Sequence, residues 1–130
     1  MANAYFLRAY CYFTLVRVFG DCPLLTSGFE SEKQEDMYPS RTAASEVYAQ
    51  VETDIEEALR LMPASSKLLH KASPAAINML RTEYYLWKAK RLGGGNAALS
   101  TAQSSVDAVL KAGYALLPTF ADIFNLNNEA

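Results

Sequence analysis

The sequence predicts an all-α protein built from antiparallel helix pairs, with four main helices, a long loop after the first and a short C-terminal helix. Apolar residues recur every three or four positions in the long segments, which is the period of one helix face. Glycine and proline stand where each periodic segment stops. A weak internal repeat relates the two halves of the chain.

The first helix is predicted to run from the start of the chain to residue 19, and it is apolar around its whole circumference. We therefore expect other elements to enclose it on all sides. Arg8 and Arg17 lie nine residues apart, about 180° round a helix. Each guanidinium needs an acceptor, for which Asp21, carboxylates of the second helix or carbonyl ends are candidates. Gly20 suits the positive-φ position that ends a helix, and Pro23 prevents its resumption.

A long loop is predicted over residues 21–41, with Phe29, Met37 and Tyr38 as apolar residues that could anchor it to the body. Thr42 is the predicted cap of the second helix. That helix ends at Pro63 and is clearly amphipathic. Its predicted core stripe is Val47, Val51, Ile55, Leu59 and Met62.

Ser73 and Pro74 form a strong start signal for the third helix, because a capping hydroxyl precedes a proline at the first helical position. The helix is expected to reach Leu92, with Ala76, Ile77, Leu80, Tyr84 and Trp87 on its apolar face. Three glycines follow, and Asn96 is the predicted cap of the fourth helix. This helix should end near Gly113, and a short helix could begin at Pro118. The predicted core face of the fourth helix is Leu99, Ala102, Val106, Val109 and Leu110.

The net charge of −2 argues against a nucleic-acid module, which needs a concentrated basic surface. The charge is nevertheless uneven along the chain. Residues 26–60 hold nine acidic residues against three basic ones, whereas residues 61–95 hold six basic residues against Glu83 alone. We expect helix faces of opposite sign to lie side by side.

Few residues suggest reaction chemistry. Cys11 and Cys22 fit no metal or CxxC spacing, and buried free thiols are favoured over a bridge. His70 has no partner residues for a metal site. Asp54, Glu56 and Glu57 could suggest the paired acids of a glycosidase, but acids on one helix favour a solvated face with a Glu56–Arg60 pair. The sequence predicts no catalytic residue, no metal site and no cofactor.

A shift of 73 residues places Arg8 on Arg81, Tyr12 on Tyr85 and Gly20 on Gly93. Two helix hairpins of this size are typical of a tetratricopeptide-like array, in which stacking covers apolar faces that one pair leaves open. We expect residues 1–130 to form a single helical-repeat region of a longer chain. The apolar surface left without neighbours is expected to self-associate.

Four blocks resemble the SusD-like (RagB/SusD) family of outer-membrane nutrient-uptake lipoproteins. The first block is quite specific to the family. The other three are moderately specific alone and support the resemblance because they follow one another in the expected order. A helix-cap glutamate common in the family is replaced by Ser45, and neither cysteine has the small-residue context of the family's lipidated cysteine. The blocks are Arg8-Ala9 through Phe19-Gly20-Asp21-Cys22-Pro23-Leu24, Arg41-Thr42 to Asp54-Ile55-Glu56-Glu57-Ala58, Lys71-Ala72-Ser73-Pro74-Ala75-Ala76, and Tyr114 to Phe120-Ala121-Asp122-Ile123-Phe124.

The resemblance implies a non-enzymatic glycan-binding subunit of a cell-surface uptake system, located at the outer membrane as a surface-exposed lipoprotein. Its implied partners are a TonB-dependent (SusC-like) transporter and an oligosaccharide or polysaccharide. This region would be a scaffold and a transporter-contacting surface, so no glycan-binding residue is carried over. The alternative is a helical-repeat module that binds a protein and no sugar; a glycoside-processing enzyme is the weakest interpretation.

Aromatic residues are the remaining candidates for sugar contact, since a ring can stack on the apolar face of a pyranose. Trp87, Tyr84 and Tyr85 have the helical spacing of core residues, which favours packing. Phe29 and Tyr38, on the long loop, are better placed to contact a ligand or partner. Even for these two, anchoring of the loop is the favoured interpretation.

Overall fold

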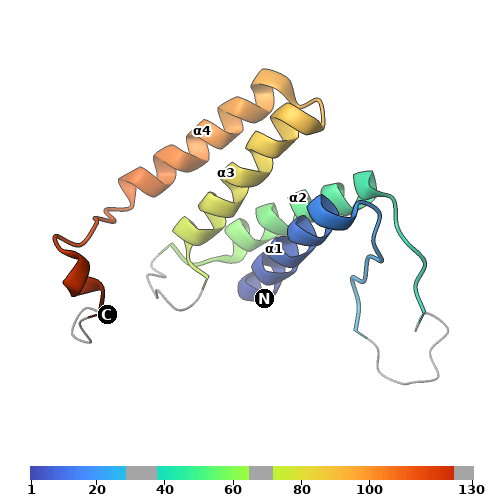
Figure 1. Cartoon of the computed structure of the whole chain (residues 1–130), viewed down its shortest axis with the longest axis horizontal. Coiled ribbons are helices and arrows are strands. Elements are labelled where there is room, and N and C mark those ends of the chain that lie inside the picture. Colours follow the sequence, from blue (N-terminus) through green and yellow to red (C-terminus); the bar gives the residue numbers. More distant parts are fainter. Residues whose placement is uncertain (29–37, 65–71, 125–130) are drawn as a thin grey trace.

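The computed structural model describes residues 1–28, 38–64 and 72–124. Within these residues the chain is all-α, as predicted (Figure 1). The elements are α1 (Ala2–Phe19), α2 (Ala44–Leu61), α3 (Pro74–Arg91), α4 (Gly95–Lys111) and the short 3₁₀ helix η2 (Phe120–Phe124). An isolated antiparallel bridge joins Cys22 to Thr42 and brings together the two ends of the predicted long loop.

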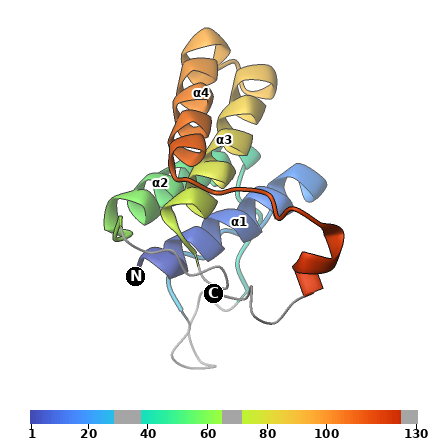
Figure 2. The ribbon, with the colours of Figure 1, turned by 90° about the vertical axis from the view of Figure 1, so that its left-hand side faces the viewer.

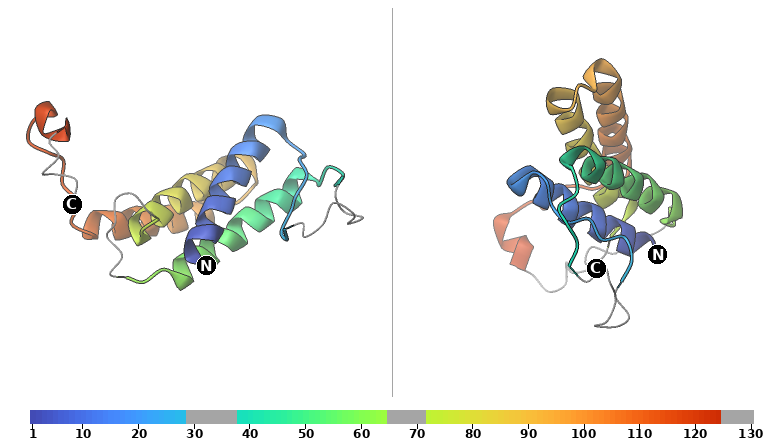
Figure 3. Two further views of the ribbon diagram at one scale, coloured as in Figure 1. Left: turned by 90° about the horizontal axis from the view of Figure 1, so that it is seen from below. Right: turned by 90° about the vertical axis from the view of Figure 1, so that its right-hand side faces the viewer.

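The helices form two antiparallel pairs, α1 with α2 and α3 with α4 (Figure 1). The second pair lies across the first, and α3 is the helix that contacts both α2 and α1 (Figures 2 and 3). Stacking of pairs through one inner helix is the arrangement expected for a helical-repeat protein, because each pair contacts only its neighbours.

Helix ends follow local sequence signals in several places. Gly20 and Gly93 end α1 and α3 with φ of 68° and 74°, which confirms the equivalence of these two positions in the repeat. The Ser73 side chain accepts the Ala76 backbone N–H at 3.2 Å, so the predicted cap is confirmed. Pro74 is the first residue of α3.

Two predicted caps are wrong. Ala43, not Thr42, occupies the cap position of α2, and the Ala44 N–H is satisfied by Asp21 Oδ1 at 2.8 Å. Thr42 instead uses its backbone N–H in the bridge to Cys22. Helix α4 begins at Gly95, which places Asn96 inside the helix.

The core lies where α1, α2 and α3 meet. Val47, Val51 and Ile55 of α2 are buried as predicted, and Leu59 and Met62 pack against the core from its edge. From the other helices, Phe13 meets Tyr84 edge to face, with ring centroids 5.6 Å apart. This contact between α1 and α3 joins the two pairs through a favourable aromatic geometry.

The predicted enclosure of the first helix is wrong for the described residues. Only one face of α1 is buried, through Ala9, Phe13 and Val16. Its other faces expose large apolar side chains, because neither α2 nor α3 covers them. The exposed residues are Leu7, Tyr10, Leu15, Val18 and Phe19.

The predicted core face of the fourth helix is only partly right. The buried residues are Ala98, Ala102 and Ser105, while Leu99 and Leu110 are exposed. Helix α4 contacts α3 and no other described helix. Small residues line this contact, because small side chains let two helices approach closely. Val106 and Val109 lie at the edge of this contact.

Outside the two pairs, η2 begins at Phe120 rather than at Pro118. Tyr38 is 90% exposed, so the predicted anchoring of the loop by this residue is wrong. Phe29 and Met37 lie outside the described residues. None of the helices described is long and apolar enough to cross a membrane.

Candidate functional site

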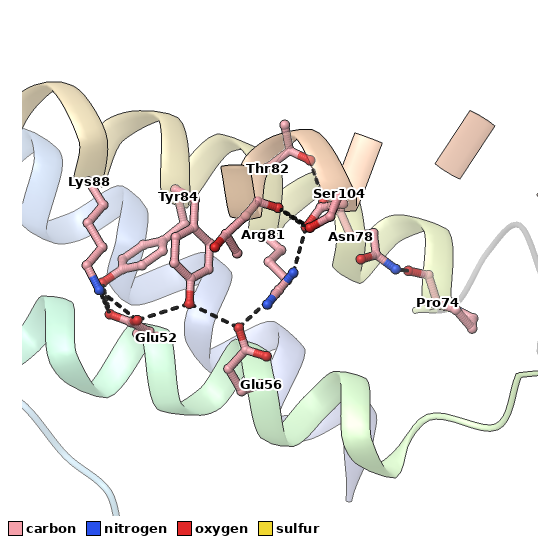
Figure 4. Close-up of polar contacts among 12 residues, drawn as sticks. Glu52, Glu56, Pro74, Asn78, Arg81, Thr82, Tyr84, Lys88 and Ser104 are labelled. Atoms are coloured by element: carbon pink, nitrogen blue, oxygen red, sulfur yellow. Dashed lines mark hydrogen bonds and ion pairs between the residues drawn. The ribbon is translucent and has the colours of Figure 1, made fainter. Parts of the chain in front are cut away.

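The most extensive polar cluster of the described residues lies between α2 and α3, and Figure 4 shows it. Glu52 of α2 is its centre. Both carboxylate oxygens of Glu52 accept from Lys88 Nζ at 2.7 Å. The hydroxyls of Tyr84 and Tyr85 donate to Glu52 at 2.9 and 3.0 Å. Three side chains of α3 are therefore fixed on one carboxylate of α2.

One turn further along α2, Glu56 repeats the arrangement. Its carboxylate accepts from Arg81 Nε at 2.7 Å, and Arg81 Nη1 donates to Ser105 Oγ of α4 at 2.8 Å. The cluster thus connects α2, α3 and α4 (Figure 4). The prediction that acidic and basic helix faces lie side by side is confirmed by these ion pairs. We call Glu52, Glu56, Arg81, Tyr84, Tyr85 and Lys88 the α2–α3 polar cluster.

Electrostatics in this cluster follow from burial and hydrogen bonding. Burial alone would raise the pKa of Glu52, but the hydrogen bonds from Lys88, Tyr84 and Tyr85 outweigh it and hold the pKa below its usual range. Burial and the hydrogen bond to Glu52 raise the pKa values of the Tyr84 and Tyr85 hydroxyls well above their usual range. The cluster is therefore an ionised carboxylate held by protonated donors.

The lowered pKa of Glu52 predicts a loss of stability in acid. The folded pKa lies below the unfolded one, so the stabilisation is present above about pH 4.3, the ordinary glutamate pKa, and disappears as pH falls through the folded value. We expect the free energy of unfolding of Glu52→Gln to fall less steeply than that of the wild type from about pH 5 to about pH 3. Urea titrations at several pH values measure this, with the exposed Glu46→Gln as control. Parallel slopes for Glu52→Gln and the wild type would contradict it.

A further ion pair joins α1 to α2. Arg8 Nε and Nη2 donate to the two oxygens of Asp54, both at 2.6 Å, and Gln50 Nε2 also donates to Asp54 at 2.8 Å. Asp54 is 1% exposed, so its predicted place on a solvated face is wrong. Arg8 takes its acceptor from the second helix, as predicted, and also donates to the Thr26 carbonyl.

Arg17 finds its partner on α3 instead. Its guanidinium pairs with Glu83, which was not among the predicted acceptors, and lies 4.1 Å from the centroid of the Phe13 ring. Arg8 and Arg17 therefore leave α1 toward different neighbours, in agreement with their spacing.

The Arg17→Met variant is expected to be tolerated, with a loss below about 1 kcal/mol, because the pair with Glu83 is open to water. A methionine also keeps the apolar contact with Phe13. Chemical denaturation measures the change. A loss of several kcal/mol would show that the pair is far better shielded from solvent than its exposure indicates.

The acidic residues of α2 do not form the paired acids of a glycosidase. Asp54, Glu56 and Glu57 each have a different partner: Arg8, Arg81 and Arg60 respectively. The predicted Glu56–Arg60 pair is wrong, because Arg81 of α3 binds Glu56 and Arg60 pairs with Glu57 one position closer. Among the described residues no group of three His, Cys, Asp or Glu side chains could hold a metal ion. His70 lies outside these residues.

The aromatic residues of α3 pack rather than form an open platform. Tyr84 is 1% exposed. Trp87 is half-buried, donates its Nε1–H to the Tyr48 hydroxyl at 3.1 Å, and meets Phe13 edge to face with centroids 6.5 Å apart. Packing, the favoured interpretation of Tyr84 and Trp87, agrees with these contacts.

The two cysteines are free thiols. Cys22 is buried, as predicted, but Cys11 is exposed, so the prediction of burial is wrong for that residue. Cys11 lies on the face of α1 that no other described helix covers. Cys22 packs in the core next to the bridge with Thr42.

Comparison with known proteins identifies the family of this chain. A sequence model of the SusD-like family, described as "Starch-binding associating with outer membrane", matches residues 1–86. The chain belongs to the SusD-like family. It is 29% identical to SusD-like protein P2 of Formosa agariphila over 129 residues, which is 99% of the chain and 25% of P2. SusD-like protein P38 of the same organism is 37% identical over 90 residues, 65% of the chain and 18% of P38.

Solved structures of SusD-like proteins show the same similarity. A SusD superfamily protein of Bacteroides vulgatus matches 98% of the chain with a TM-score of 0.82 and 32% identity, and the match covers 26% of that protein. NanU of B. fragilis matches 98% of the chain with a TM-score of 0.83 and 30% identity, again over 26% of its length. This SusD-like chain therefore spans about a quarter of the length of the relatives it matches. The family description names binding and association with the outer membrane, and no reaction.

Proposed function

We propose that this chain is part of a non-enzymatic glycan-binding protein of a SusC/SusD-like outer-membrane uptake system. Within that protein it would form a scaffold and a surface that contacts the transporter. The observation that carries the proposal is the match of residues 1–86 to a family described by starch binding and outer-membrane association. The intact protein would be a surface-exposed lipoprotein that delivers oligosaccharides to a TonB-dependent transporter.

Two features of the helices support a scaffold role for this region. The α2–α3 polar cluster and the Phe13–Tyr84 contact fix one helix pair on the other. The rings of Tyr84 and Trp87 make packing contacts, which leaves them poorly suited to stack on a sugar. Sugar capture would then depend on residues elsewhere in the intact protein.

Calorimetric titration of the intact gene product with a panel of oligosaccharides, malto-oligosaccharides included, tests the glycan-binding proposal. We expect saturable binding of at least one glycan and no release of reducing ends. Release of reducing ends would instead indicate a glycoside-processing enzyme. Absence of binding across the panel would contradict the proposal.

The scaffold role predicts a separation between stability and affinity in the intact protein. Trp87→Ala is expected to lower the free energy of unfolding by about 2 kcal/mol, because a half-buried ring and its hydrogen bond are lost. Oligosaccharide affinity should stay within about twofold of the wild type. Phe19→Ala, which removes an exposed ring of α1, is the control and should change neither quantity. Loss of affinity in either variant at unchanged stability would place sugar binding in this region.

A helical-repeat module that binds a protein partner and no sugar is the second candidate. The exposed apolar faces of α1 and α3 favour it, because large exposed apolar surfaces mark interaction sites. The two candidates differ in the calorimetric titration. A gene adjacent to this one that encodes a TonB-dependent transporter would favour the glycan-uptake role.

A further inference from the structure

We draw no further inference here: the strongest candidate, the apolar groove between α1 and α3 that Phe6, Tyr10 and Leu86 help to line, lies open in a chain that spans about a quarter of the length of its matched relatives, and nothing in the structure shows what covers it.

Discussion

Asp54→Ala is expected to lower the free energy of unfolding by about 3 kcal/mol, because it removes the carboxylate that neutralises Arg8 beside the core. Asp54 accepts both guanidinium hydrogen bonds and a third from Gln50. Without it, the partly buried guanidinium keeps its charge and loses its main acceptor. Urea denaturation at neutral pH measures the change.

Glu57→Ala is the control for the Asp54 variant, since it removes another carboxylate of α2 that pairs with an arginine. Its pair with Arg60 is exposed and screened by solvent, so the expected loss is much smaller than that of Asp54→Ala. Replacing Arg8 and Asp54 together by methionine and leucine should recover part of the stability, because no unpaired charge remains. Equal losses for Asp54→Ala and Glu57→Ala would contradict the importance of the buried pair.

Phe13→Ala should destabilise the protein by about 3–5 kcal/mol, the range for removing a buried phenylalanine ring. The ring is 1% exposed and contacts Tyr84 and Trp87 edge to face. Alanine would leave a cavity at the point where α1 meets α3. Thermal and urea unfolding followed by circular dichroism measure the loss.

Phe19→Ala is the matched variant for Phe13→Ala, because it makes the same substitution on the same helix at a position 65% exposed. Its expected effect is within about 0.5 kcal/mol. A similar loss in both variants would mean that the outer face of α1 is covered in solution.

The positions of the helices could be predicted from the sequence because their signals are local. Gly20 and Gly93 end helices through a backbone conformation that glycine adopts readily. Ser73 and Pro74 start α3 through two neighbouring residues. The stripe of α2 was predictable because that helix packs along one continuous face, so the period of its apolar residues and the direction of its burial agree.

Pairing between helices could not be predicted from these local signals. Arg60 was expected to bind Glu56, but Arg81 approaches from α3 and takes that carboxylate. Burial of Asp54 depends on α1 lying over it, which no residue near Asp54 indicates. The cap of α2 comes from Asp21, more than twenty residues earlier in the sequence, because the bridge at Cys22 brings the two segments together.

The faces of α1 and α4 were mispredicted for a related reason. An apolar residue on a helix predicts burial only when another element covers that direction. α1 is apolar on every side, yet α2 and α3 cover one side of it. α4 packs on α3 through alanine and serine, which an analysis of large apolar residues overlooks.

Differential scanning calorimetry of residues 1–130 tests most directly whether the two helix pairs form one stack held by the α2–α3 polar cluster and the Phe13–Tyr84 contact. We expect a single transition in which the calorimetric and van't Hoff enthalpies agree, because the pairs unfold together. In Glu52→Gln and Phe13→Ala the whole transition should move to lower temperature. Two separate transitions, or a shift of only one part of the transition in these variants, would contradict the account.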